Sequence, residues 1–406
     1  MVLARRLLAT TGGSGSFPPP LPTVRTITSA PAGGWTQAPH PVATESGGVT
    51  FFGYARGDNG DICARSYTAA TDTTSAEFVL HAALEVDTHD APAVLVRSSD
   101  QRLVAVYTKH DSENHIYQRI STNPADTSAW AAETQIHPGS TTVTYPTLLE
   151  FGGSLWLFYR DEQDGATTGV LCYVRSTDNG ATWGGQVALY KYASHQAYWV
   201  IRAGATRVDF LVNDGHPVSE TPALYHFSYD GSTWRKSDGT DLGFTGAAPL
   251  TPADITQIDD GSAGPCSPWD IARVGSEVVA SYTRFTSYPT DLRIAYARWN
   301  GSTWATHHVV AAGSVAAGDG PGSCLEAGTL DAIYTASKDT GQWEIARRVT
   351  GDAGATWTTY ALTTSSATPN IYPTRVHDWD SGARMIWFTG SYTSYLVYSV
   401  GVKGYG

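Results

Sequence analysis

Four side chains capable of acid–base or anion-binding chemistry stand at matching places in two neighbouring stretches of the chain. His89 comes just before the apolar run AVLV, and His110 follows the next apolar run, LVAVY. Tyr145 and Arg160 flank the following pair of runs in the same way. Imidazole and phenol groups transfer protons, and guanidinium groups bind carboxylates. In an antiparallel pair, the start of one strand and the end of the next lie at the same edge. We therefore expect His89 and His110 to face each other across one rim, beside Tyr145 and Arg160.

Other titratable or aromatic residues occupy corresponding places later in the chain and are candidates for contacts with a substrate. A single histidine or tyrosine beside a strand is usually structural, so the prediction depends on the gathering of several such groups at one rim. These further candidates are Tyr198, His216, Trp269, Arg284 and Lys338.

A recurring turn motif indicates the scaffold that positions these residues. Its clearest copies are STDNGATW and TGDAGATW, with weaker copies PADTSAW, SYDGSTW and RWNGSTW. Each follows a predicted strand, and Asp and Gly favour a tight hairpin turn at that place. The spacing of the motif and the runs between its copies predict blades of four short strands. We predict an all-β fold, a single seven-bladed β-propeller over residues 22–406, with TVRTITS at 23–29 closing the ring.

The first 21 residues predict an arm or linker rather than a packed element, because they end in GGSGSFPPPLP. Both a disordered start and a tether to a larger assembly remain open. The apolar stretch near the start is too short for a good secretion signal. We expect an extracellular or virion-associated protein that reaches its location as a mature form or by another route.

Composition excludes several classes of function. A net charge of −12 argues against binding to nucleic acid, although local Arg and His groups can still hold an acidic sugar. No apolar segment is long enough to span a membrane. We expect no metal and no cofactor, because ligand spacings and nucleotide-binding fingerprints are absent. Of the four cysteines, Cys266 and Cys324 occupy similar places in adjacent repeats. A bridge between them and four free thiols are both open.

Several stretches, taken in order, resemble one known family. They are GGWTQAPHPVATESGGVTFFGYARGDNGDICARSY, VDTHDAPAVLV, LVAVYTKH, HIYQRIS, TYPTLLEFGGSLWLFYR and FLVNDGHP. Together they resemble the BNR-repeat (Asp-box) propeller family that includes ulvan lyases. The resemblance implies cleavage of a polysaccharide at a uronic acid by β-elimination. It also implies His89 as base, Tyr145 as acid, and Arg160 with His110 at the uronate carboxylate; the base and acid are exchangeable.

One residue departs from the family pattern. Asp90 stands beside His89 where the family often has Asn, and we expect this carboxylate to raise the pKa of His89 or to repel an anionic substrate.

Two functions follow from the sequence. The first is a lyase acting on a uronate-containing glycan, such as an acidic polysaccharide. The second is a non-catalytic glycan-binding propeller of a phage tail or another surface assembly, docked through the N-terminal arm. Convergence of His89, Tyr145 and Arg160 around a cleft favours the lyase, and burial of Tyr145 makes the lyase interpretation fail.

Overall fold

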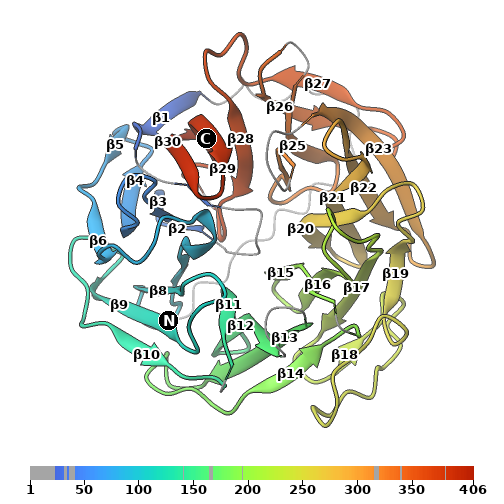
Figure 1. The fold of residues 1–406 in the computed structure, drawn as a ribbon, viewed down its shortest axis with the longest axis horizontal. Coiled ribbons are helices and arrows are strands. Elements are labelled where there is room, and N and C mark those ends of the chain that lie inside the picture. Colours follow the sequence, from blue (N-terminus) through green and yellow to red (C-terminus); the bar gives the residue numbers. More distant parts are fainter. Residues whose placement is uncertain are drawn as a thin grey trace.

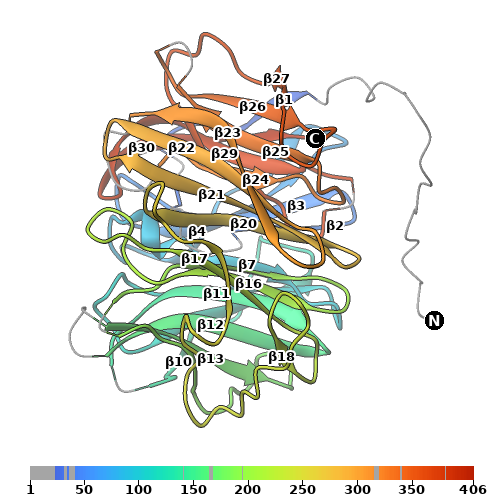
Figure 2. The same ribbon diagram turned by 90° about the vertical axis from the view of Figure 1, so that its right-hand side faces the viewer.

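Seven antiparallel sheets surround a common axis in the computed structural model, as Figure 1 shows. The structure describes residues 23–31, 34–35, 42–139, 141–163, 168–193, 195–314, 320–338, 341–379 and 381–406. The predicted seven-bladed propeller is confirmed. Figure 2 shows the ring edge-on. No helix in these ranges is long and apolar enough to cross a membrane, and the predicted arm at residues 1–21 lies outside them.

The first three blades carry the candidate rim. Blade 1 consists of β2 (Ala43–Ser46), β3 (Val49–Ala55), β4 (Ile62–Thr68), β5 (Thr73–Thr74) and β6 (Phe78–His81). The short 3₁₀ helix η1 (Thr88–Asp90) leads into blade 2, which consists of β7 (Ala93–Val96), β8 (Arg102–Tyr107), β9 (Ile116–Pro124) and β10 (Thr134–Ile136). Blade 3 consists of β11 (Val143–Phe151), β12 (Ser154–Gln163), β13 (Thr168–Ser176) and β14 (Val187–Tyr190).

The remaining blades complete the ring. Blade 4 consists of β15 (Trp199–Ala203), β16 (Val208–Asn213), β17 (Leu224–Tyr229), β18 (Trp234–Arg235) and β19 (Thr256–Asp259). Blade 5 consists of β20 (Cys266–Val274), β21 (Glu277–Ser287), β22 (Asp291–Trp299) and β23 (Trp304–Gly313). Blade 6 consists of β24 (Ser323–Leu325), β25 (Ala332–Ser337), β26 (Glu344–Val349) and β27 (Thr358–Ala361). Blade 7 consists of β28 (Asn370–Arg375), β29 (Met385–Ser394), β30 (Val397–Tyr405) and β1 (Val24–Thr28).

Strands of blade 2 are apolar on both faces because a neighbouring blade covers each face. Alternate residues therefore belong to two different cores. One core is shared with blade 3 and contains Ala93, Leu95, Val104 and Val106. The other is shared with blade 1 and contains Val94, Val96, Leu103, Ala105 and Tyr107. This packing on both sides fixes the ends of β7 and β8, where the candidate histidines lie.

The recurring turn motif forms hairpins between the third and fourth strands of its blades. Asp178, between β13 and β14, accepts hydrogen bonds from the Thr182 amide at 2.9 Å and the Ser176 hydroxyl at 2.8 Å. Asp352, between β26 and β27, repeats this pattern. Because strands alternate in direction, these hairpins lie at the opposite end of the blades from His89 and His110. The motif is therefore scaffold. The four cysteines are free and buried, with no Cys266–Cys324 bridge.

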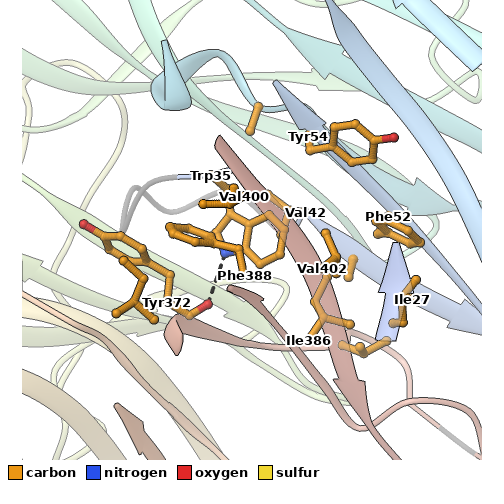
Figure 3. Close-up of a cluster of buried hydrophobic side chains, with 14 of the residues drawn as sticks. Ile27, Trp35, Val42, Phe52, Tyr54, Tyr372, Ile386, Phe388, Val400 and Val402 are labelled. Carbon is orange, nitrogen blue, oxygen red and sulfur yellow. Dashed lines mark hydrogen bonds between the residues drawn. The ribbon is translucent and has the colours of Figure 1, made fainter. Parts of the chain in front are cut away.

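The ends of the chain meet in blade 7. The strand β1 pairs with β30, from Val24 opposite Tyr405 to Thr28 opposite Val402, and so supplies the missing outer strand as predicted. Figure 3 shows the apolar seam between this blade and blade 1. Within the seam the Trp35 indole donates a hydrogen bond to the Tyr372 carbonyl at 3.2 Å. The two ends of the chain therefore complete one sheet, and this pairing holds the ring closed.

A buried carboxylate also joins blade 1 to blade 7. Glu45, which is 3% exposed, accepts hydrogen bonds from the amides of Ser381 at 3.0 Å and Gly382 at 2.8 Å. It also accepts one from the Gly48 amide at 3.1 Å.

We expect Glu45→Ala to lower the free energy of unfolding by about 2–4 kcal/mol, because it leaves buried donors without an acceptor. Denaturant unfolding measures this loss. The matched control is Glu277→Ala, which removes a carboxylate that pairs with Arg298 at the surface. The control should cost less than about 1 kcal/mol. Equal losses in both variants would show that Glu45 does not hold the seam.

Candidate active site

The two candidate histidines stack face to face at one rim of the propeller. His89 lies in η1, just before β7, and His110 follows β8. Their ring centroids are 4.0 Å apart, with 14° between the ring planes. The prediction from strand direction, that the two would face each other, is confirmed.

One carboxylate, that of Asp87, contacts both imidazoles. Its Oδ1 lies 2.5 Å from His89 Nδ1 and accepts a hydrogen bond from the His89 amide at 2.8 Å. Its Oδ2 lies 3.4 Å from His110 Nδ1. Because the carboxylate accepts a hydrogen bond from the Nδ1–H of His89, the Nε2 of a neutral His89 is the unprotonated nitrogen. Asp87 is not among the residues predicted from the sequence, although an Asp two residues before His at the start of a helical turn is a recognisable capping signal.

The surroundings move the pKa values of the two histidines in opposite directions. Burial lowers the pKa of His89, and the charge of His110 lowers it further. Burial also opposes protonation of His110, but its hydrogen bond to the Asp87 carboxylate and the charge of Asp111 raise its pKa overall. Two titratable groups with separated pKa values suit one base and one acid. Of the two, His110 is therefore the one that holds a proton more readily and His89 the one that loses it first.

Asp87, His89 and His110 offer ligand atoms within 4.8 Å of one another, which is close enough for a metal ion. The ring geometry does not suit one. A histidine nitrogen binds a metal along a lone pair in the plane of its ring. Since the two rings are stacked nearly parallel, these lone pairs run side by side and do not converge on one point. The arrangement fits a shared carboxylate instead.

Tyr145 places its hydroxyl against the histidine pair. The oxygen lies 3.2 Å from His110 Nε2. Tyr145 has a φ of 57° at an irregularity of β11, where the register shifts between Thr144 and Thr147. Tyr372 has a similar φ of 56° in the corresponding strand of blade 7, so the strained conformation is a recurring feature of the scaffold. Tyr145 is only 2% exposed. This is the outcome under which the lyase interpretation drawn from the sequence fails, so a lyase needs a proton donor other than Tyr145 alone.

Arg160 lies beneath two tyrosine rings. Its guanidinium carbon is 4.5 Å from the ring centre of Tyr145 and 5.3 Å from that of Tyr198. The side chain is buried and pairs with the buried carboxylate of Glu162. Gly169 on the next strand makes room for it, because a Cβ there would stand 2.5 Å from Arg160 Cδ. These contacts fix the guanidinium beside the histidine pair.

Two further residues that sequence analysis did not select also border the pair. Asp111 lies with Oδ2 3.2 Å from His110 Nε2 and Oδ1 3.5 Å from Arg160 Nη2. Tyr395, at the tip of the β29–β30 hairpin, packs edge-on against His89 with centroids 4.8 Å apart. Its carbonyl accepts a hydrogen bond from the Thr88 amide at 3.0 Å. Tyr395 is 38% exposed and forms the open border of the cluster.

The structure brings six of the nine predicted residues together. His216 joins through Tyr198, whose ring meets it edge-on at 5.5 Å. The six are His89, His110, Tyr145, Arg160, Tyr198 and His216.

The other three predicted residues make their contacts elsewhere. Trp269 is buried and donates a hydrogen bond to the Thr283 hydroxyl. Arg284 pairs with Asp259. Lys338 lies 5.1 Å from the Trp343 ring centre. Their roles in substrate binding stay predictions.

Asp90 behaves differently from the sequence-based expectation. It is 1% exposed, and within the described residues neither carboxyl oxygen has a hydrogen-bond partner. Burial and the charges of Asp87 and Glu85 raise its pKa well above the usual range. The pKa of His89 is lowered, so the expected increase beside Asp90 is wrong. A protonated Asp90 is neutral and has nearly the shape of an asparagine side chain.

Comparison with known proteins supports the fold. No curated protein matches the chain. The solved structure of a polysaccharide lyase of family PL25, an ulvan lyase, is similar with a TM-score of 0.71 and 15% identity, over 94% of each chain. The crystal structure of polysaccharide lyase Uly1 is similar with a TM-score of 0.61 and 12% identity, over 95% of this chain and 99% of that one. A model of the BNR repeat-containing family matches residues 49–312. Since this match covers more than half of the chain, the protein belongs to the BNR repeat-containing family.

Proposed function

We propose that this propeller is a polysaccharide lyase that cleaves a uronate-containing glycan by β-elimination. The observation that carries the proposal is the stacked pair of histidines with separated pKa values, in which His110 shares the carboxylate of Asp111 with the cationic Arg160. The likeness of the fold to two solved polysaccharide lyases is consistent with it.

Three chemical tasks make up this reaction. The carboxylate on C5 must be neutralised so that the C5 proton becomes acidic, and Arg160 with protonated His110 supplies the positive charge. A base must remove that proton, and neutral His89 has the free Nε2 for it. An acid must protonate the departing oxygen on C4. Since C4 adjoins C5, a group that holds the carboxylate also lies near this oxygen.

The burial of Tyr145 opposes its action as a lone acid. Its hydroxyl touches His110 Nε2, and the His110 side chain is 21% exposed. We therefore assign proton donation to the Tyr145–His110 pair. His110 is the member partly exposed to solvent, and the buried phenol of Tyr145 contacts its Nε2.

The same burial favours a second candidate, a propeller that binds a glycan without cleaving it. His89, Tyr145 and Arg160 are each less than a tenth exposed. In this alternative the protein is the receptor-binding module of a phage tail or another surface assembly, located outside the cell or on a virion. Attachment through residues 1–21 is part of this alternative, and their removal with a test of assembly would examine it.

Turnover separates the two functions. The protein is incubated with a panel of acidic polysaccharides, including glucuronan and ulvan, and the ultraviolet absorbance of the unsaturated uronate is followed. The lyase predicts new absorbance that His89→Ala and Tyr145→Phe reduce. Binding to a glycan with no absorbance on any member of the panel would establish the binding module.

The pH profile of kcat/KM should be bell-shaped. The rate rises as His89 loses its proton, below the usual histidine pKa of about 6.5, and falls as His110 loses its proton above that value. Initial rates between acid and mildly alkaline pH measure both limbs. In His110→Gln the alkaline limb should disappear along with most of the activity. An unchanged alkaline limb in this variant would exclude His110 as the titrating group.

A further inference from the structure

The carboxylate of Asp111 lies where the proposed mechanism requires the carboxylate of a substrate. Its two oxygens contact different cations, with Oδ2 3.2 Å from His110 Nε2 and Oδ1 3.5 Å from Arg160 Nη2. These are the two groups that would neutralise a uronate. A planar carboxylate that bridges an imidazolium and a guanidinium shows what geometry of anion the pair accepts.

We propose that Asp111 is an internal competitor that occupies the uronate carboxylate site and must leave it when a uronate binds. This inference rests on the proposed function, since it concerns the same site. Both contacts are longer than the usual 2.7–2.9 Å of a strong charged hydrogen bond, as expected of a partner that exchanges.

The position of Asp111 is compatible with such an exchange. Its side chain is 25% exposed, whereas Arg160 is 1% exposed and cannot itself move away. Asp111 follows the end of β8 and has a φ of 51°. A carboxylate in a partly exposed turn can rotate into water, which hydrates it at little cost. Arg160 would keep its buried partner Glu162 after Asp111 leaves.

The competitor also affects which ligands the site admits. Asp111 adds a negative charge beside the proposed sugar position, so an anionic glycan meets repulsion as well as the two cations. A neutral sugar has no carboxylate with which to displace it. The exchange therefore favours sugars that carry a carboxylate over neutral sugars. It also weakens the binding of the carboxylate-bearing sugars, because they must displace Asp111.

Asp111→Asn tests this directly, because asparagine tolerates a positive φ and keeps the size of the side chain without its charge. D-glucuronate and D-glucose are titrated by ligand-observed NMR at about pH 6, where His110 stays protonated. We expect the variant to bind glucuronate about three- to thirtyfold more tightly than the unaltered protein, as expected when a like charge is removed. Binding of glucose should not change.

Asp111→Gly is the second variant, since glycine also accepts this φ and removes the side chain. It should bind glucuronate at least as tightly as Asp111→Asn. The matched control is Asp291→Asn, which alters another partly exposed Asp–Arg pair, with Arg293 in blade 5, and should leave glucuronate binding unchanged.

Unchanged or weaker glucuronate binding in both Asp111 variants overturns the inference and assigns Asp111 a supporting role for His110. Absence of glucuronate binding in every variant also overturns it. Tighter binding without lyase turnover on any glycan upholds the inference while the proposed lyase reaction fails, so the two outcomes are distinguishable.

Discussion

Substituting His89 with alanine is expected to lower kcat/KM on a uronate glycan by about 10²–10⁴-fold, the usual contribution of a general base. The Nδ1 of His89 is held by Asp87, which orients the ring and leaves Nε2 for the proton. The substitution removes this nitrogen and leaves a space of imidazole shape against His110 and Tyr395. Added imidazole should therefore restore part of the activity, and initial rates with and without imidazole measure the recovery.

A second buried histidine provides the control. His226 also pairs with a buried carboxylate, that of Asp209, at 3.0 Å, but it lies in blade 4 away from the rim. His226→Ala should lower the melting temperature without a change in the kcat/KM of the folded fraction, and imidazole should have no effect on its rate. If His89→Ala keeps kcat/KM within a few-fold of the unaltered protein, His89 is not the base.

The rim was predictable from the sequence because antiparallel connectivity alone decides which strand ends meet. His89 and His110 are joined by one hairpin, so their approach needed no knowledge of the packing between blades. Tyr145 and Arg160 are placed by the same rule one blade later. The turn motif marks the same hairpin in five of the blades, and the strand runs before and after its copies predict the first and the last blade.

Antiparallel connectivity does not predict contacts between side chains of blades that are distant in the sequence. Tyr395 reaches the histidines from blade 7, and no local pattern around it distinguishes it from other exposed hairpin residues. Trp269, Arg284 and Lys338 are predicted from their analogous positions, and these roles stay predictions because the direction of a side chain depends on bulges that composition does not reveal. The burial of Tyr145 has the same origin, because the irregularity in β11 turns its ring beneath His110.

Asp111 and Asp87 illustrate a further limit. Asp87 carries only a capping signal, and Asp111 carries no signal that separates it from other aspartates near strand ends. Their importance appears only when both oxygens of each carboxylate are seen to join two side chains. The histidine pair, the arginine and these two carboxylates form one alternating set of charges, so a change in any member alters the protonation of the others.

Substituting Asp90 with asparagine should stabilise the protein by an amount that increases with pH. The pKa of Asp90 is raised in the folded state by burial and by the charges of Asp87 and Glu85. In the unfolded chain it returns to about 3.9. Between these two values the folded state binds the proton more strongly, so the unaltered protein loses stability as pH rises from the unfolded to the folded pKa. Asparagine has no proton to lose, and the stability difference should increase by up to about 1.4 kcal/mol per pH unit in this window.

Denaturant unfolding at several pH values from about 4 to 8 measures that slope, because this pH range lies above the pKa of Asp in the unfolded chain. Asp126→Asn is the control, for which we expect a change in the free energy of unfolding of the opposite sign. The Asp126 carboxylate accepts hydrogen bonds from Asn123 and the Ser128 amide, which lower its pKa. Its replacement should destabilise the protein at neutral pH and have less effect in acid. A pH-independent difference for Asp90→Asn would mean that Asp90 is ionised in the folded protein. In that case its negative charge lies beside His89, and the repulsion of anionic substrates expected from the sequence would return as the main obstacle to the lyase reaction.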